Sequence, residues 1–151
     1  MSNDAYLAAL RMLARRELSE AQVRQRLVRR EHDPASIDEA ISRLKANRSI
    51  DDTRVAGMIA RMETSVRRRG KPRVRRQIEA AGIAPAIAAR AVEETFQDLD
   101  PDALLTAALE KRLRGRDRIA DDREFRRLYR YLVTQGFEPD RVLARLRPLR
   151  P

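Results

Sequence analysis

The sequence of 151 residues carries 33 Lys and Arg residues against 23 Asp and Glu residues, which gives a formal net charge of +10. This balance favours polyanionic partners, such as nucleic acid, a nucleoprotein or an acidic protein surface. The chain has no cysteine, which excludes disulfides, thiol catalysis and Cys-ligated metals. No apolar run approaches the ~20 residues that cross a bilayer, and the first residues lack a signal-peptide core, so we expect a cytoplasmic protein with no membrane partner.

Hydrophobic residues make up 42% of the chain, whereas aromatic residues make up 4% and charged residues 37%. These proportions predict a thin core of Ala, Leu, Ile and Val. Apolar residues recur at helical spacing, and no alternating strand pattern is present. We therefore predict an all-α fold built from short helical units, each packed mainly on its neighbours.

The first unit is predicted to contain three helices. The helix over 5–16 is expected to bury Leu7, Leu10, Met12, Leu13 and Ala14. Ser19 and Gln22 have the spacing of a capping box, which opens a second helix that runs to about residue 30. Asp33 as N-cap and Pro34 at the first position open the third helix.

The second unit begins with a helix after Asp51-Asp52, with Val55, Ile59, Met62 and Val66 expected inward. Gly57 inside this helix predicts the close approach of a neighbouring helix, because glycine there is otherwise unfavourable. Gly70 and Pro72 then break one helix and open the next. That helix ends at Gly82, where a left-handed residue without a Cβ is least strained, and Pro85 opens the last one.

The third unit opens at Asp100-Pro101, and Leu104, Leu105, Ala108 and Leu109 form the apolar stripe of its first helix. Gly115 interrupts that helix inside the basic stretch RLRGRDR. Asp121 or Asp122 opens the next helix, which is expected to bury Phe125, Leu128 and Leu132. The last helix follows Pro139, and the sequence ends RPLRP.

One turn recurs in all three units, as AGIAP, QGFEP and REHDP. A shift of 54 residues places Val74, Ile78 and Gly82 on Leu128, Leu132 and Gly136, and a shift back by 51 places Pro85 on Pro34. Self-similarity of this kind indicates an internal repeat. We predict an elongated, curved array of three tandem three-helix, helix-turn-helix-like repeats, with boundaries at 1–50, 51–98 and 99–151.

The residues give no basis for catalysis. His32 is the single histidine and lies in a turn, so a His-based metal site or nucleophile–base pair is excluded. The Asp51-Asp52 and Asp121-Asp122 pairs stand where helices begin, which favours capping over acid–base chemistry. No phosphate-binding glycine motif is present. We therefore predict a protein that is not an enzyme and holds no cofactor and no metal.

Basic residues recur on the second helix of each unit and just before it. The predicted binding surface consists of Arg24, Arg26, Arg29 and Arg30; of Arg67, Arg68, Arg69, Lys71, Arg73, Arg75 and Arg76; and of Arg123, Arg126, Arg127 and Arg130. Stacked units would place these sets along one cationic surface. The alternative interpretation is a solvated face, since most charge runs have no other role.

Sequence-specific reading of DNA is not expected, because the third helices begin PASIDEA, PAIAARA and PDRVLAR and offer few groups for base edges. Phosphate contact by the second helices is easier to support, and Tyr6, Tyr129 and Tyr131 could stack on bases. An architectural or transcription-regulating DNA-binding protein stays an alternative, as does a helical scaffold for an unrelated acidic partner.

Four stretches in order resemble the RecX family, bacterial regulatory proteins of the RecA recombinase. They are ALRMLARRELSEAQVRQRLVRR, SIDDTRVAGMIAR, GKPRVRRQIEAAGI and EFRRLYRYLVTQGFEPDRVLARL. Two positions depart from the family pattern: Glu31-His32-Asp33 stands where Gly–Phe–Asp is usual, and Val55 stands where Phe is usual. Both are changes of packing residues.

The resemblance implies a curved array of three-helix repeats that binds in the groove of the RecA–single-stranded-DNA filament. It also implies inhibition of filament growth, and hence of the ATPase, strand-exchange and co-protease activities of RecA, by a protein with no enzymatic activity of its own. We expect a monomer whose partners are the RecA filament and single-stranded DNA, the latter bound weakly and salt-sensitively when alone.

Overall fold

A computed structural model describes residues 3–151, so the first two residues of the predicted 1–50 repeat lie outside it. The described part is all helical, as predicted, and contains no strand. The helices are α1 (Asp4–Arg15), α2 (Glu20–Arg29), α3 (Pro34–Ala46), α4 (Asp52–Arg61), α5 (Lys71–Ala80), α6 (Pro85–Phe96), α7 (Pro101–Leu113), α8 (Asp122–Thr134) and α9 (Pro139–Leu146). A π-helical turn, Met62–Val66, follows α4, and a 3-10 turn, Arg147–Leu149, follows α9.

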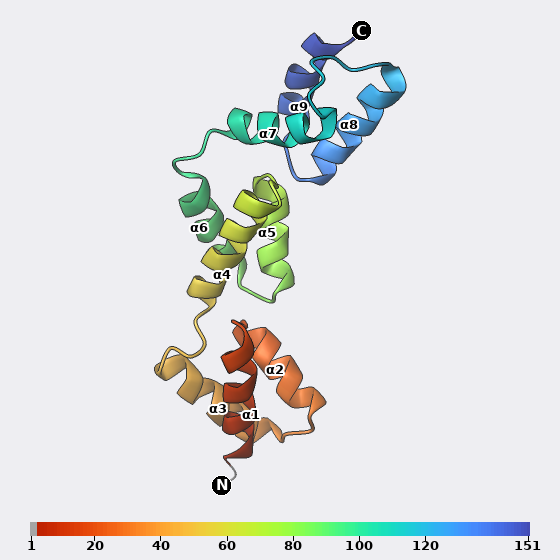
Figure 1. The fold of residues 1–151 in the computed structure, drawn as a ribbon. Helices are drawn as coiled ribbons and strands as arrows, with labels where there is room; N and C mark the ends of the chain where they lie inside the picture. Colours follow the sequence, from red (N-terminus) through yellow and green to blue (C-terminus); the bar gives the residue numbers. More distant parts are fainter. Residues whose placement is uncertain (1–2) are drawn as a thin grey trace.

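The helices form three groups of three that follow one another in an elongated, curved array (Figure 1), which confirms the predicted fold class. Each group has its own apolar cluster, from Ala5 to Ile50, from Val55 to Phe96 and from Leu105 to Leu146. Leu104 packs against both the second and the third cluster. The two ends of the described chain lie at opposite ends of the array (Figure 1), and the main helix–helix contacts lie within one group.

Helix N-termini are capped where the sequence predicted caps. The Ser19 hydroxyl accepts a hydrogen bond from the Gln22 backbone N–H at 3.1 Å, and the Gln22 side chain accepts one from the Ser19 N–H at 3.0 Å. The predicted capping box is thus confirmed. Asp33 caps α3 through the backbone N–H of Ser36 at 3.2 Å, and Asp121, of the two candidates, caps α8.

The predicted buried faces of α1 and α4 are partly wrong. Helix α1 buries Ala5, Ala8, Ala9 and Met12, whereas Leu7 is 43% exposed and Ala14 is exposed. Helix α4 buries Val55, Ala56 and Ala60, and the π-helical turn then buries Glu63 and Thr64. Met62 and Val66, predicted inward, are 50% and 64% exposed. Alanine faces let the helices approach closely, so they are buried in preference to the larger side chains.

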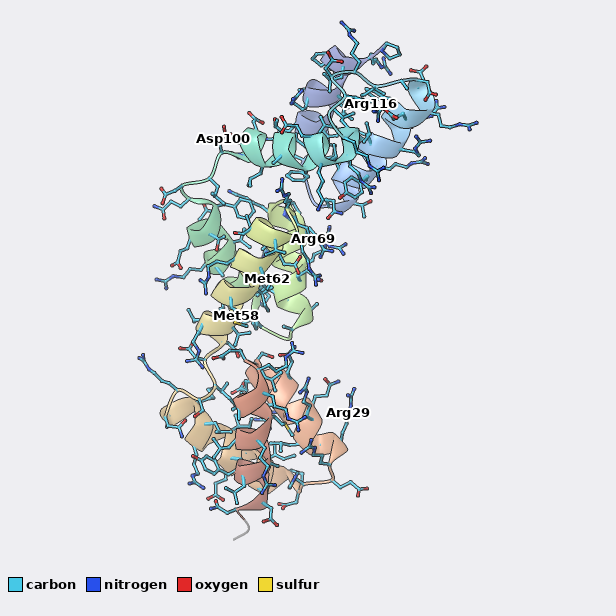
Figure 2. All side chains as sticks on the ribbon, in the orientation of Figure 1. Arg29, Met58, Met62, Arg69, Asp100 and Arg116 are labelled. Carbon is cyan, nitrogen blue, oxygen red and sulfur yellow. The ribbon has the colours of Figure 1, made fainter. Side chains whose placement is uncertain are left out.

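Gly57 does not mark a close helix contact, contrary to the prediction. A Cβ at this position would meet only the Arg61 side chain of the next turn, at 3.2 Å. Met58 and Met62 project outward from the same stretch of chain (Figure 2).

The first and second groups meet where the N-terminus of α2 lies against the turn between α5 and α6. The Ser19 hydroxyl donates to the backbone carbonyl of Ala81 at 2.5 Å in a buried contact. The backbone N–H of Glu20 donates to the Asp52 carboxylate at 2.9 Å. A Cβ on Gly82 would lie 2.5 Å from the Cβ of Ala21. The turn therefore has no room for a side chain at Gly82.

The second and third groups meet in the same manner. The backbone N–H of Gly70, the N-cap of α5, donates to the carbonyl of Gln135 at 3.0 Å. A Cβ on Gly136 would overlap the Cβ of Arg73 and lie 2.7 Å from its backbone nitrogen. Gln135 follows Ala81 by the 54 residues of the sequence repeat. One joint is therefore built twice, with the start of a second helix seated on the next group's glycine turn.

Candidate functional site

The second helix of each group, α2, α5 and α8, lies on the same side of the array in the view of Figure 1. The repeated joint explains this placement, because α2 begins against the turn that ends α5, and α5 begins against the turn that ends α8. All the cations that the sequence predicted as a binding surface belong to these helices or to their flanking residues.

The first set of cations is partly neutralised. Arg24 forms an ion pair with Asp38 at 2.6 Å, and Arg26 is half-buried. Arg29 and Arg30 are exposed, and neither makes an ion pair within residues 3–151. Figure 2 shows Arg29 on the outer side of α2.

The middle set differs most from its expected exposure. The stretch from Arg67 to Arg76 has no acid, but Glu63 precedes it and is 5% exposed. Its carboxylate accepts from Arg69 at 2.8 Å and lies 3.5 Å from Arg67. A buried carboxylate is unfavourable unless it is paired. Arg69, whose side chain is only 16% exposed, therefore stabilises the π-helical turn and is not a free surface cation.

The other middle cations divide in the same way. Arg73 is half-buried against the Gly136 turn, Arg75 pairs with Glu79 at 3.2 Å, and Lys71 lies 4.0 Å from Glu93. Arg68 is exposed and donates to the backbone carbonyl of Ala107 at 3.3 Å. Arg76 is exposed, with no carboxylate in ion-pair range in the described part of the chain.

The third set is the most open. Arg123, Arg126 and Arg130 are exposed, and none of them pairs with a carboxylate of residues 3–151. Arg127 lies 3.9 Å from Glu124. That the three sets form a binding surface stays a prediction, because the structure shows where these cations lie and not what binds them.

Four further cations belong to this region and are not among the predicted site residues. Lys111 and Arg112 lie in the last turn of α7, and Arg114 and Arg116 lie just beyond it. They face Arg127 and Arg130 of α8 across a hollow of about 710 Å³. The sequence signal for three of them is the basic stretch RLRGRDR, from which only a helix interruption is predicted.

A second hollow of about 280 Å³ is lined by Arg67, Arg68 and Arg69 from the end of the π-helical turn and by Gln135 from the end of α8. Both hollows include Lys111 and Tyr131 in their walls. The two hollows therefore lie side by side, the larger within the third group and the smaller at its joint with the second, and we call them together the basic groove. Figure 2 labels Arg69 near one end and Arg116 near the other.

Two contacts order the walls of the basic groove. The guanidinium of Arg112 lies over the Tyr131 ring, 3.7 Å from its centroid. Arg116 donates to Glu124 at 2.9 Å. This hydrogen bond is the largest cause that lowers the pKa of Glu124, supported by the Ala120 backbone N–H and the charges of Arg116 and Arg127 and opposed by burial. Glu124 therefore stays ionised at neutral pH and holds the α7–α8 loop against α8.

His32 is half-buried in the turn between α2 and α3. Within residues 3–151, no cluster of three His, Asp or Glu side chains could hold a metal ion. None of the helices in this range is long and apolar enough to span a membrane.

Comparison with known proteins gives a consistent result. A family model described as "RecX, first three-helix domain" matches residues 5–44. The chain is 33% identical over 135 residues to "Regulatory protein RecX" of Syntrophotalea carbinolica, covering 89% of this chain and 88% of the relative. It is also 33% identical to the same-named protein of Halorhodospira halophila, covering 91% and 83%.

The fold has solved counterparts. A crystal structure of RecX from Lactobacillus salivarius superposes with a TM-score of 0.74 at 21% identity, covering 97% of this chain and 95% of that one. A crystal structure titled as regulatory protein RecX gives 0.73 at 18% identity, covering 96% of this chain and 70% of that one. At these identities the structures support the arrangement of helices.

Proposed function

The chain belongs to the RecX family of regulatory proteins, and from this premise we propose that it binds the groove of the RecA–single-stranded-DNA filament and inhibits RecA. Inhibition would extend to the RecA ATPase, strand exchange and co-protease activities, with the chain contributing no chemistry of its own. We further propose a monomer in the cytoplasm as the acting form.

The observation that carries this proposal is the placement of α2, α5 and α8 on one side of an elongated array (Figure 1). Exposed arginines from the first, middle and third sets, such as Arg29, Arg76 and Arg126, lie on these helices. A curved molecule with charges at several points along its length can contact successive protomers and phosphates together. Many weak contacts on one body combine into a large avidity, and Arg forks suit both phosphates and carboxylates.

The direct test measures the single-stranded-DNA-dependent ATPase of RecA while this protein is added well below one copy per RecA. We expect strong inhibition at these ratios, since one bound copy would block filament growth past itself. An unchanged ATPase at equimolar protein would contradict the proposal. Tight, sequence-dependent binding to naked duplex DNA would instead favour an architectural or transcription-regulating protein.

A matched pair of variants tests the surface. Arg75→Glu/Arg76→Glu changes exposed positions of α5, and Arg61→Glu/Arg90→Glu makes the same charge change on α4 and α6. The first pair is expected to weaken inhibition about tenfold or more, and the second pair by much less, at equal helix content and melting temperature. Equal effects would mean that only net charge matters, through long-range attraction.

A further inference from the structure

The walls of the basic groove are electrostatically unbalanced. Nine basic residues line its two hollows against one acidic residue, Glu124. Lys111, Arg112, Arg114 and Arg130 form no ion pair with any carboxylate of residues 3–151. Like charges gathered in a concave surface repel one another and concentrate anions near it. An anionic ligand would therefore stabilise this arrangement.

The shape of the groove favours an extended ligand. Its larger hollow, at about 710 Å³, is as large as the pockets that hold whole small-molecule ligands, about 300–1,000 Å³. The smaller hollow lies beside it and brings Arg67 and Arg68 of the second group near the same cations, with Lys111 and Tyr131 lining both hollows. A single phosphate would contact only a few of these cations, whereas a linear polyanion would contact those of both hollows.

The Arg112–Tyr131 pair distinguishes between linear polyanions. Tyr131 is half-buried against the third apolar cluster, and the exposed Arg112 guanidinium covers its ring at 3.7 Å. The guanidinium thus lies within stacking distance of the ring, while the Arg112 side chain as a whole is exposed to solvent. Guanidinium planes stack on nucleic-acid bases. An acidic peptide has no flat group of this kind in each residue, so the pair favours nucleic acid.

We propose that the basic groove binds one single strand of nucleic acid, with phosphates on Lys111, Arg114 and Arg130 and a base stacked on Arg112. The inference deepens the proposed function, because it assigns strand contact to the third group, beside its joint with the second. It leaves the α2 arginines for protein contact. The site is tested on a free strand, so the result does not depend on whether RecA is the filament partner.

The experiment measures fluorescence anisotropy of a labelled 15-nucleotide oligo-dT at several salt concentrations, with the full chain. Lys111→Ala/Arg114→Ala is expected to weaken binding about tenfold at low salt and to reduce the magnitude of the slope of log affinity against log salt by about 1.4, because each of the two lost phosphate contacts contributes roughly 0.7 for a single strand. The control Arg61→Ala/Arg90→Ala removes two cations outside the groove and should leave affinity and slope nearly unchanged.

Arg112→Lys isolates the stacking contact, because it keeps the charge and removes the plane. We expect it to weaken oligo-dT binding about fivefold or more, as stacking is worth ~1–3 kcal/mol per base. Binding of an abasic 15-mer of the same charge should not change. Equal losses on both strands, or no loss on either, would overturn the base-stacking role.

Two results would overturn the site as a whole. One is unchanged strand affinity in the Lys111→Ala/Arg114→Ala variant with an unchanged melting temperature. The other is competition by poly-glutamate of equal charge as strong as that by oligo-dT, which would assign the groove to an acidic protein segment. Normal strand binding together with an unaffected RecA ATPase would leave the groove in place and refute only the proposed function.

Discussion

The turn after α2 and the turn after α8 have the same place in the repeat but different surroundings. Both reverse the chain through a left-handed residue, Glu31 with φ of 62° and Gly136 with φ of 102°. Glu31 is exposed, whereas Gly136 is buried against the start of α5. The turn after α5, with Gly82 at φ of 79°, resembles the third one and lies against Ala21.

The difference shows that glycine has two separate roles in this repeat. It avoids the strain of a left-handed backbone, which costs other residues roughly 1–2 kcal/mol, and it leaves space for the backbone of the preceding group. At the turn that holds Glu31, only the left-handed backbone would favour glycine, because no group of the described chain packs on that turn. The departure from Gly–Phe–Asp at Glu31-His32-Asp33 therefore falls at the one turn where a side chain can be accommodated.

The largest effect is expected from Gly136→Ala. The new Cβ would overlap Arg73 and the backbone of α5, so either the joint opens or the turn moves. We expect a loss of about 3 kcal/mol or more, combining overpacking of ~1–3 kcal/mol with the left-handed strain, measured by urea unfolding. The variant should also lose inhibition of RecA, because the spacing of α5 and α8 is no longer fixed.

Gly115→Ala is the matched control. Gly115 has φ of 85°, but a Cβ there would meet no atom within 4 Å. It should therefore show the strain alone, roughly 1–2 kcal/mol. Equal losses from the two substitutions would mean that the joint contributes nothing to the requirement for glycine at Gly136.

Gly82→Ala should have the next largest effect, about 2–3 kcal/mol, because its Cβ would press on the Ala21 side chain and the turn is left-handed. The contact is with one methyl group, so Ala21→Gly should relieve part of it. A double-mutant cycle in urea is expected to show coupling of about 1 kcal/mol in the favourable direction. Strict additivity would show that the first joint adapts without this contact.

Ser19→Ala should cost about 2 kcal/mol. The substitution removes an N-cap, worth ~1 kcal/mol, and leaves the buried carbonyl of Ala81 without the hydroxyl that donates to it at 2.5 Å. Asp121→Ala removes an N-cap that lies away from both joints, so it should cost only the ~1 kcal/mol of the cap. Chemical denaturation of both variants separates the two contributions, and equal losses would remove Ser19 from the joint.

Much of the fold could be predicted because its signals are local. Prolines, capping residues such as Ser19 and Asp33, and the glycine turns all act within a few residues of themselves. The buried faces of α1 and α4 could not be predicted this way, because hydrophobicity favours Leu7 and Met62 over Ala8 and Ala60. Which face is buried depends on how closely another helix approaches, and that helix is distant in sequence.

The candidate site shows the same limit. The clustering of Arg67, Arg68 and Arg69 was evident in the sequence, but the burial of Glu63, which pairs Arg69, depends on the π-helical turn. Arg112 and Arg127 line the same hollow because α7 and α8 form a hairpin. Local sequence identified where charge is dense, and the structure shows which charges are already paired within the chain.

The smallest effect is expected at the exposed turn after α2. Glu31→Gly should raise stability by up to about 1 kcal/mol, because it relieves the left-handed strain, partly offset by the greater freedom of glycine in the unfolded chain. RecA inhibition should not change, since Glu31 touches neither joint. The measurement is the urea midpoint of the variant beside that of Gly115→Ala, which removes a glycine from another left-handed position, where a Cβ meets no atom within 4 Å. A loss of stability on Glu31→Gly would show that the Glu31 side chain itself stabilises the first turn, and that the two turns differ by more than the presence of a neighbouring group.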